Sequence, residues 1–154
     1  MKTPSIQHIL VPVDFSEGTR HAIDYALSLG GKFTVRITLL HVHAPIYIPA
    51  TEVGFDYAAS VRQDSGEAEA HLKELAASVA TDIEVDTQMS YGIPWDCIVK
   101  WAVEHRVDLI IMPTHGRSGL KHLLLGSVAE RVVQHAHCPV LVVRESPELT
   151  AGSP

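Results

Sequence analysis

Five segments of the chain are rich in apolar and β-branched residues. They run nearly without polar interruption, as strands do when helices cover both faces of a sheet. Each is bounded by glycine, proline or polar residues, which are typical of turns. The pattern predicts strands over Ile6–Val13, Thr34–Val42, Ile83–Met89, Asp108–Met112 and Val140–Val143.

Apolar residues at helical spacing lie between these strands. The residues that mark helix ends support the same division: Ser16 is a good N-cap, Gly30 and Gly31 end the first helix, and Pro94 suits a first helical turn. Ser127 and Glu130 form a predicted capping box at the start of the fourth helix. The predicted buried faces carry Ala22, Ile23, Ala26 and Leu27; Ala68, Leu72, Leu75, Ala76 and Val79; Ile98, Trp101 and Ala102; and Val128, Val132 and Val133.

Strands and helices therefore alternate along the whole chain. This order predicts an α/β domain with a parallel sheet and right-handed crossovers. His43–Ala59 is the exception, since it contains Pro45, Pro49 and Gly54 and is predicted to be irregular, lying over the sheet edge or covering a partner.

Composition narrows the class of protein. The 154 residues are 46% hydrophobic, which is enough for one domain with a substantial core. A net charge of −6 argues against nucleic-acid binding and against attraction to anionic membranes. No apolar run reaches the length of a membrane helix, and the first residues lack the apolar core of a signal peptide, so the cytoplasm is the expected location. Cys97 and Cys138 form no metal or redox motif and are expected to be reduced thiols.

The region after the fourth strand carries the strongest functional signal. Gly116 follows the strand closely, and Gly126 and Ser127 come ten residues later at a predicted helix start. Ligands bind at the carboxyl ends of strands in open α/β sheets, and helix N-termini bind anions. The arrangement predicts a phosphate cradle, although its spacing matches neither G-x-G-x-x-G nor the P-loop.

Four segments together resemble the universal stress protein family. They are Val11 to Ser16 (VPVDFS), Leu39 to Val42 (LLHV), Thr114-His115-Gly116 with nine residues before Gly126-Ser127, and Cys138 to Val143 (CPVLVV). The chain departs from the nucleotide-binding branch at one position, where Pro113 stands in place of the first glycine of G-x-x-G.

The resemblance implies a single α/β domain over residues 1–146. The tail at 147–154 is expected to be flexible, because it is small, polar and contains proline. It implies an open parallel five-stranded sheet of order 3-2-1-4-5 with helices on both faces, as in the adenine nucleotide alpha hydrolase-like fold. The ligand crevice then lies between the first and fourth strands, where the strand order reverses.

The function implied by the resemblance is a homodimeric stress-response sensor or regulator that binds ATP, or AMP or ADP, with magnesium. The implied dimer contact is the strand Val140–Val143, and at most slow ATPase activity is expected. The alternative is a member of the family that binds no nucleotide and acts as a protein-interaction module. The implied nucleotide-binding residues are Pro12, Val13, Asp14, Val42, Met112, Pro113, His115, Gly116, Arg117, Gly126, Ser127, Val128 and Ala129.

Several of these residues have a purely structural interpretation as well. Asp14 either contacts the nucleoside or shapes the helix start near Ser16. Gly116 either leaves room for a phosphate or provides a turn with positive φ. Ser127 either donates to a phosphate or caps its helix. The basic residues Arg117, Lys121 and His122 either neutralise phosphates or face solvent.

Metal binding and catalysis have little support in the sequence. The ten histidines include His41 with His43 and His135 with His137, but no spacing matches a zinc motif. No nucleophile is evidently paired with a general base, so no catalytic residue is predicted.

Overall fold

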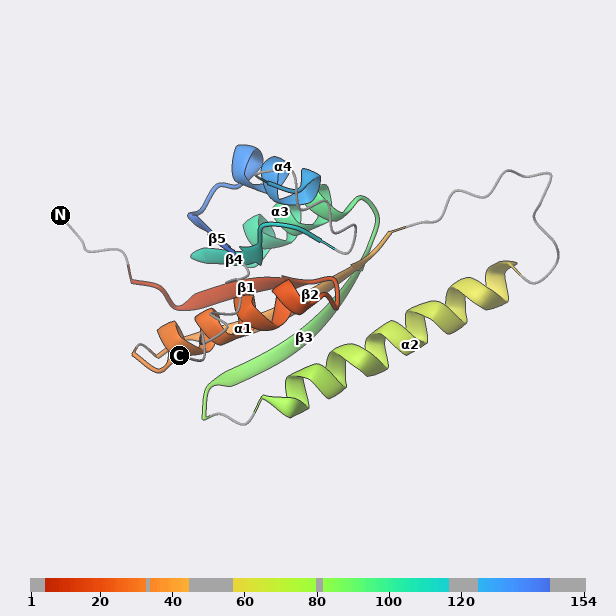
Figure 1. The fold of residues 1–154 in the computed structure, drawn as a ribbon, viewed down its shortest axis with the longest axis horizontal. Coiled ribbons are helices and arrows are strands. Elements are labelled where there is room, and N and C mark those ends of the chain that lie inside the picture. Colours follow the sequence, from red (N-terminus) through yellow and green to blue (C-terminus); the bar gives the residue numbers. More distant parts are fainter. Residues whose placement is uncertain (1–4, 33, 45–56, 80–81, 117–124, 145–154) are drawn as a thin grey trace, which may run out of the picture.

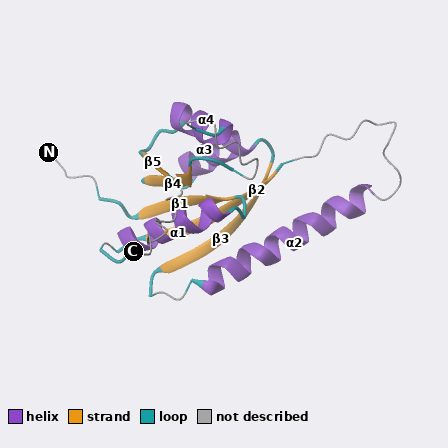
Figure 2. Ribbon diagram, viewed as in Figure 1, coloured by secondary structure: helices purple, strands orange, loops and turns teal. Residues whose placement is uncertain are grey.

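The computed structural model describes residues 5–32, 34–44, 57–79, 82–116 and 125–144. Its elements alternate as predicted (Figures 1 and 2). The strands are β1 (His8–Val13), β2 (Arg36–His43), β3 (Glu84–Tyr91), β4 (Leu109–Pro113) and β5 (Val140–Val143), and the helices are α1 (Glu17–Gly30), α2 (Tyr57–Ser78), α3 (Pro94–Glu104) and α4 (Ser127–His135). The predicted tail at 147–154 and most of the predicted irregular segment lie outside the described residues, and α2 begins at the end of that segment.

The five strands form one parallel sheet in the order β3-β2-β1-β4-β5. This confirms the predicted fold class and strand order. β1 lies at the centre and pairs with β2 on one side and β4 on the other, so the strand order reverses between β1 and β4. The carboxyl ends of these central strands diverge into turns that lead to different helices, which leaves space for a crevice.

Helices cover both faces of the sheet (Figure 1). On one face, Ala22, Ala26 and Leu72 from α1 and α2 pack against the buried side chains of β1 and β2. On the other face, α3 and α4 contribute a second core that includes Ile98, Ala102, Ala129 and Val132. Strand alternation explains the two cores, because neighbouring residues such as Leu39 and Leu40 point to opposite faces.

Two predictions about burial are wrong. β3 was expected to be covered on both faces, but Glu84, Gln88 and Tyr91 are exposed because β3 is an edge strand with a polar sequence. Val133 was expected in the core, yet its side chain is 47% exposed. Ala129 and Val132 already form the buried face of α4, and Val133 is rotated away from it by about 100° of helix.

Both cysteines are free thiols, as predicted. Burial raises the pKa of the Cys138 thiol, which keeps it protonated and weakly nucleophilic. None of the helices in the described ranges has the length and apolar character needed to cross a membrane.

A buried histidine lies at the amino ends of the strands, far from the crevice. His8 is 4% exposed, and its Nε2 lies 2.8 Å from the Thr38 hydroxyl. The Arg36 guanidinium donates to His8 Nδ1 at 3.1 Å, so the neutral imidazole accepts at Nδ1 and donates from Nε2 to Thr38. Burial, followed by the charge of Arg36, lowers the pKa of His8 below 6.5.

Acidic groups around His8 oppose this shift without reversing it. Asp86 from β3 and Asp108 beside β4 favour the imidazolium, as does the carbonyl of His105 after α3. Asp86 Oδ1 is itself buried and has no hydrogen-bond partner in the part of the chain that the structure describes.

We therefore expect His8 to make folding stability depend on pH. With a lowered pKa in the folded state, the unfolded chain binds more protons, so this contribution is complete above about pH 6.5 and is lost as the pH falls through the folded pKa. Chemical denaturation should measure how far the free energy of unfolding falls between pH 7.5 and pH 5.5. We expect this fall to be smaller in His8→Gln than in wild type. An equal loss in the two proteins would contradict this assignment.

Candidate functional site

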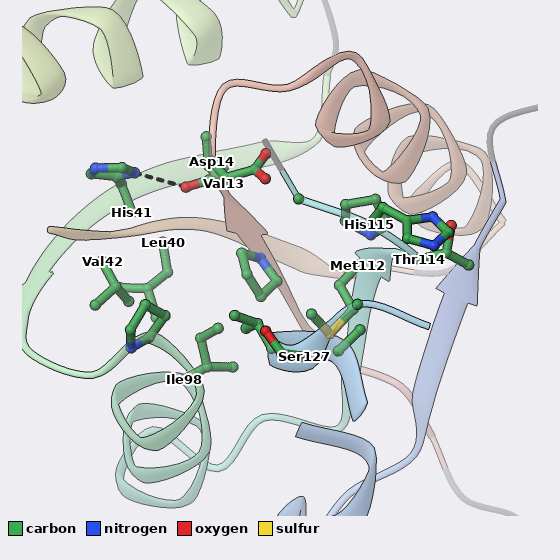
Figure 3. Close-up of a pocket in the computed structure, with 17 residues that line it drawn as sticks. Val13, Asp14, Leu40, His41, Val42, Ile98, Met112, Thr114, His115 and Ser127 are labelled. Atoms are coloured by element: carbon green, nitrogen blue, oxygen red, sulfur yellow. Dashed lines mark hydrogen bonds between the residues drawn. The ribbon is translucent and has the colours of Figure 1, made fainter. Parts of the chain in front are cut away.

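A cavity of about 250 Å³ opens at the carboxyl ends of β1, β2 and β4 (Figure 3). The first turn of α4 and one side of α3 complete its wall. The cavity lies at the point where the strand order reverses, which is the location predicted for the ligand crevice.

Every predicted site residue that the structure describes lines this cavity. From β1 and the turn after it come Pro12, Val13 and Asp14; from β2, Val42; from β4 and the turn after it, Met112, Pro113, His115 and Gly116; and from the start of α4, Gly126, Ser127, Val128 and Ala129. Arg117 lies outside the described residues, as do Lys121 and His122. The structure thus brings together segments more than 100 residues apart, while their role in binding stays a prediction.

Five other lining residues were not among the predicted site residues, although three of them lie in the segments that carry the resemblance. These five are Leu40, His41, Pro94, Ile98 and Thr114. Leu40 could have been found, because it lies two residues before Val42 and shares its face of β2. Ile98 could not have been found from the sequence, since α3 reaches the cavity only through tertiary packing. Leu40 and Ile98 are buried and, with Val42 and Met112, they form an apolar wall (Figure 3).

Asp14 has one oxygen committed to its own turn. Its Oδ1 accepts hydrogen bonds from the Ser16 amide at 3.0 Å, the Ser16 hydroxyl at 2.5 Å and the Thr19 hydroxyl at 2.8 Å. Ser16 is the N-cap of α1, as predicted, but its side chain makes no capping bond, and its hydroxyl donates to Asp14. Oδ1 of Asp14 therefore shapes the start of the helix near Ser16, which is the structural role considered for this residue.

The other oxygen of Asp14 faces the loop after β4. A Cβ atom added to Gly116 would lie 3.0 Å from Asp14 Oδ2, so these two turns approach closely. Oδ2 accepts no hydrogen bond from the described residues and is available to a ligand. Gly116 does not have positive φ, so the need for glycine here is close approach rather than a left-handed turn.

The start of α4 differs from the prediction. Gly126 is the N-cap, and Ser127 is the first residue of the helix, so the proposed capping box of Ser127 and Glu130 is wrong. The Gly126 amide instead donates to the Thr114 carbonyl at 2.6 Å, which ties the helix start to the end of β4. A Cβ atom at Gly126 would lie 3.0 Å from that same oxygen, which explains the glycine.

The first turn of α4, which lines the cavity, has three amide donors with no hydrogen-bond partner in the part of the chain that the structure describes. The amides of Ser127, Val128 and Ala129 precede the first intrahelical bond, which runs from the Glu130 amide to the Gly126 carbonyl. No side chain in the described ranges caps them. Three convergent N–H groups and the positive end of the helix dipole favour an anion at this edge of the cavity.

The chemistry available in the cavity is therefore divided between two sides. The wall of Leu40, Val42, Ile98 and Met112 suits a flat apolar ring, and Asp14 and α4 supply polar contacts at the rim. Within the described ranges, no three His, Cys, Asp or Glu side chains converge as a metal site would require. A small ligand with an apolar ring at one end and an anionic group at the other matches this arrangement.

Fold and site define a class of α/β domain with a ligand cavity at the reversal of its strand order, and comparison with known proteins identifies the family. The model of the universal stress protein family matches residues 5–144. The chain is 34% identical to a universal stress protein of Methanocaldococcus jannaschii over 139 residues, which cover 89% of this chain and 81% of that protein.

Solved structures agree with this relationship. The universal stress protein UspA from Lactobacillus plantarum superposes with a TM-score of 0.80 at 28% identity, covering 92% of this chain and all of that one. A universal stress protein in complex with cAMP has a TM-score of 0.64 at 26% identity, covering 89% and 96% of the two chains. The chain belongs to the universal stress protein family.

Proposed function

We propose that this protein binds an adenine nucleotide in the cavity at the ends of β1, β2 and β4. The observation that carries the proposal is the pairing, in one cavity, of an apolar wall with three amides of α4 that have no hydrogen-bond partner among the described residues. A structural relative in complex with cAMP supports the ligand class. In the proposed pose, the base lies against Leu40, Val42, Ile98 and Met112.

Asp14 and α4 then receive the polar parts of the nucleotide. Ribose hydroxyls donate to Asp14 Oδ2, the carboxylate oxygen that is left open by the turn. Phosphates accept hydrogen bonds from the amides of Ser127, Val128 and Ala129. The exposed hydroxyl of Ser127 is available to the same phosphates, because it does not cap the helix.

ATP with magnesium is the proposed physiological ligand, with AMP and ADP as alternatives. Magnesium usually keeps several waters and binds through substrate phosphates, so the ion would bind the phosphate chain while Asp14, the carboxylate among the described lining residues, contacts the ribose. The ion would neutralise phosphate charge. Asp14 itself would orient the ribose, and the amides of α4 would hold the phosphate chain.

The biological role that we infer is that of a stress-response sensor or regulator in the cytoplasm, where ATP is available. Residues 1–146 form the proposed functional domain, and two copies pair through β5 to give a homodimer. The Ser16 and Thr19 hydroxyls donate to Asp14, but neither residue lines the cavity, so neither is assigned as a nucleophile. Binding, with at most slow hydrolysis, is the proposed activity.

Co-purified nucleotide is the direct test of this function. Mass spectrometry of denatured purified protein should detect an adenine nucleotide, and calorimetry of nucleotide-free protein should give micromolar affinity for ATP with magnesium. Titrations with AMP, ADP and GTP identify the preferred ligand. Protein that is free of nucleotide and gives no heat with any of them would contradict the proposal.

A second candidate function is protein interaction without nucleotide, and Pro113 favours it. Proline fixes φ and lacks an amide hydrogen, whereas the family's nucleotide binders carry glycine at this position. Pro113 is nevertheless buried at the end of β4, pairs with Val143 in the sheet and lines the cavity. We infer that its ring forms part of the cavity wall.

We expect Pro113→Gly to change ATP affinity by less than about tenfold, or 1.4 kcal/mol. The variant should also lose roughly 0.4–1 kcal/mol of stability, because glycine adds freedom to the unfolded chain. Calorimetry and chemical denaturation of the two proteins measure both effects. If wild type gives no heat with ATP while the glycine variant binds at micromolar level, Pro113 blocks the site and the interaction function is favoured.

A further inference from the structure

The backbone is strained at Phe15, in the turn that carries Asp14. Phe15 has a φ of 62°, in the left-handed region that bulky side chains rarely adopt. Such a conformation persists only where surrounding contacts hold it, and strain of this kind gathers at functional sites. The contacts of Phe15 therefore bear on the shape of the nucleotide site.

Two histidines hold the ring of Phe15. His41 of β2 packs against it with ring centroids 4.8 Å apart, and His71 of α2 does so at 5.4 Å. Both separations lie in the range of favourable aromatic pairs. Phe15 therefore lies between an imidazole from the sheet and one from a helix that is distant in the sequence.

His41 also fixes the residue on the other side of Asp14. Its Nδ1–H donates to the Val13 carbonyl at 2.7 Å, as the dashed line in Figure 3 shows. Asp14 is thus held through Val13 before it and Phe15 after it, and His41 contacts both. The hydrogen bonds from Ser16 and Thr19 then orient the carboxylate within this turn.

His71 reaches this turn across a groove. A space of about 430 Å³ lies between the start of α1 and α2, and Phe15 and His71 both line it. α2 is anchored to the sheet elsewhere, mainly through Leu72, which is 1% exposed. The His71 ring is therefore a contact between α2 and the Asp14 turn that can be removed without opening the core.

We propose that His71 is a positioning residue for the nucleotide site, acting through Phe15 and His41. The three rings hold the Asp14 turn in the conformation that receives the nucleoside, so the position of α2 is linked to nucleotide affinity. A partner that displaced α2 would weaken binding, and by reciprocity the nucleotide would oppose that displacement. The effect on affinity rests on the proposed function, whereas the effect on the turn does not.

The test compares two substitutions at His71, which does not line the nucleotide cavity. We expect His71→Ala to weaken binding of ATP with magnesium by about threefold to tenfold, the loss of roughly one aromatic pair. His71→Phe, which keeps a ring, should restore most of the affinity. His105→Ala is the matched control, because it removes a histidine stacked on Trp101 at the opposite end of the sheet, and it should bind as wild type does.

Hydrogen exchange gives a second measurement that needs no ligand. Amides of residues 14–19 should exchange faster in His71→Ala than in wild type and return to wild-type rates in His71→Phe. Equal exchange and equal affinity in all three proteins would overturn the proposal, as would an equal loss in both His71 variants. If wild type binds no adenine nucleotide, the proposed function fails, and the exchange rates alone decide whether the rings position the turn.

Discussion

Gly126→Val is expected to weaken adenine-nucleotide binding by at least about tenfold, or 1.4 kcal/mol. A hydrogen bond from the Gly126 amide to the Thr114 carbonyl holds Gly126 against the end of β4. Even a single Cβ atom added to Gly126 would lie 3.0 Å from that oxygen. The added Cβ atom would also lie 3.4 Å from the Cα of His115. Valine adds two further methyl groups, so the first turn of α4 must move, and with it the amides proposed to bind phosphate.

Gly66→Val is the matched control for this prediction. Gly66 lies in α2, where an added Cβ would meet nothing within 4 Å, so the same substitution should leave affinity unchanged. Calorimetry with ATP and magnesium measures binding, and circular dichroism verifies the fold of each variant. A folded Gly126→Val protein that binds ATP as wild type does would show that α4 does not hold the phosphates.

Leu141→Lys is expected to convert a homodimer into monomers. β5 is an edge strand of four apolar residues, and Leu141 at its centre is 36% exposed. Val133 on α4, the helix that precedes β5, is also exposed, at 47%. Two copies related by a twofold axis can pair this edge, whereas two lysines brought together there would repel each other and keep the edge in water.

The acidic edge at β3 is a poor alternative for the same contact. Glu84 is exposed on that strand, so two copies that paired there would bring like charges together. Sedimentation velocity should give a dimer for wild type and a monomer for Leu141→Lys. Val103→Lys on α3 replaces another exposed apolar residue, 52% exposed, and should remain dimeric. Wild-type protein that is monomeric at high micromolar concentration would contradict the pairing.

Local sequence was enough to predict the elements of this fold. The apolar runs and helical spacing gave strands and helices within two residues of most observed boundaries. Alternation of the two predicted a parallel sheet, because a crossover helix returns the chain to the same end of the sheet. The strand order came from the family resemblance of Asp14, Gly116 and Gly126 with their neighbours, since periodicity carries no information on which strands are adjacent.

The sequence also determined where the cavity would form. Asp14 ends one strand and Gly116 follows another, and in a parallel sheet all carboxyl ends lie on one side. Residues such as Val13, Val42 and Met112 were implied by the family resemblance, and each lies at or beside the end of a strand. This information is local to each segment, which is why a single chain reveals it.

Tertiary structure alone decided how these residues are used. One oxygen of Asp14 is committed to Ser16 and Thr19, and the start of α4 is capped by Gly126 because its amide meets the Thr114 carbonyl. Ile98 reaches the cavity through the packing of α3, and the ring of Phe15 lies between His41 and His71. Each of these contacts depends on the relative placement of segments that are distant in the chain, and no spacing within one segment encodes that placement.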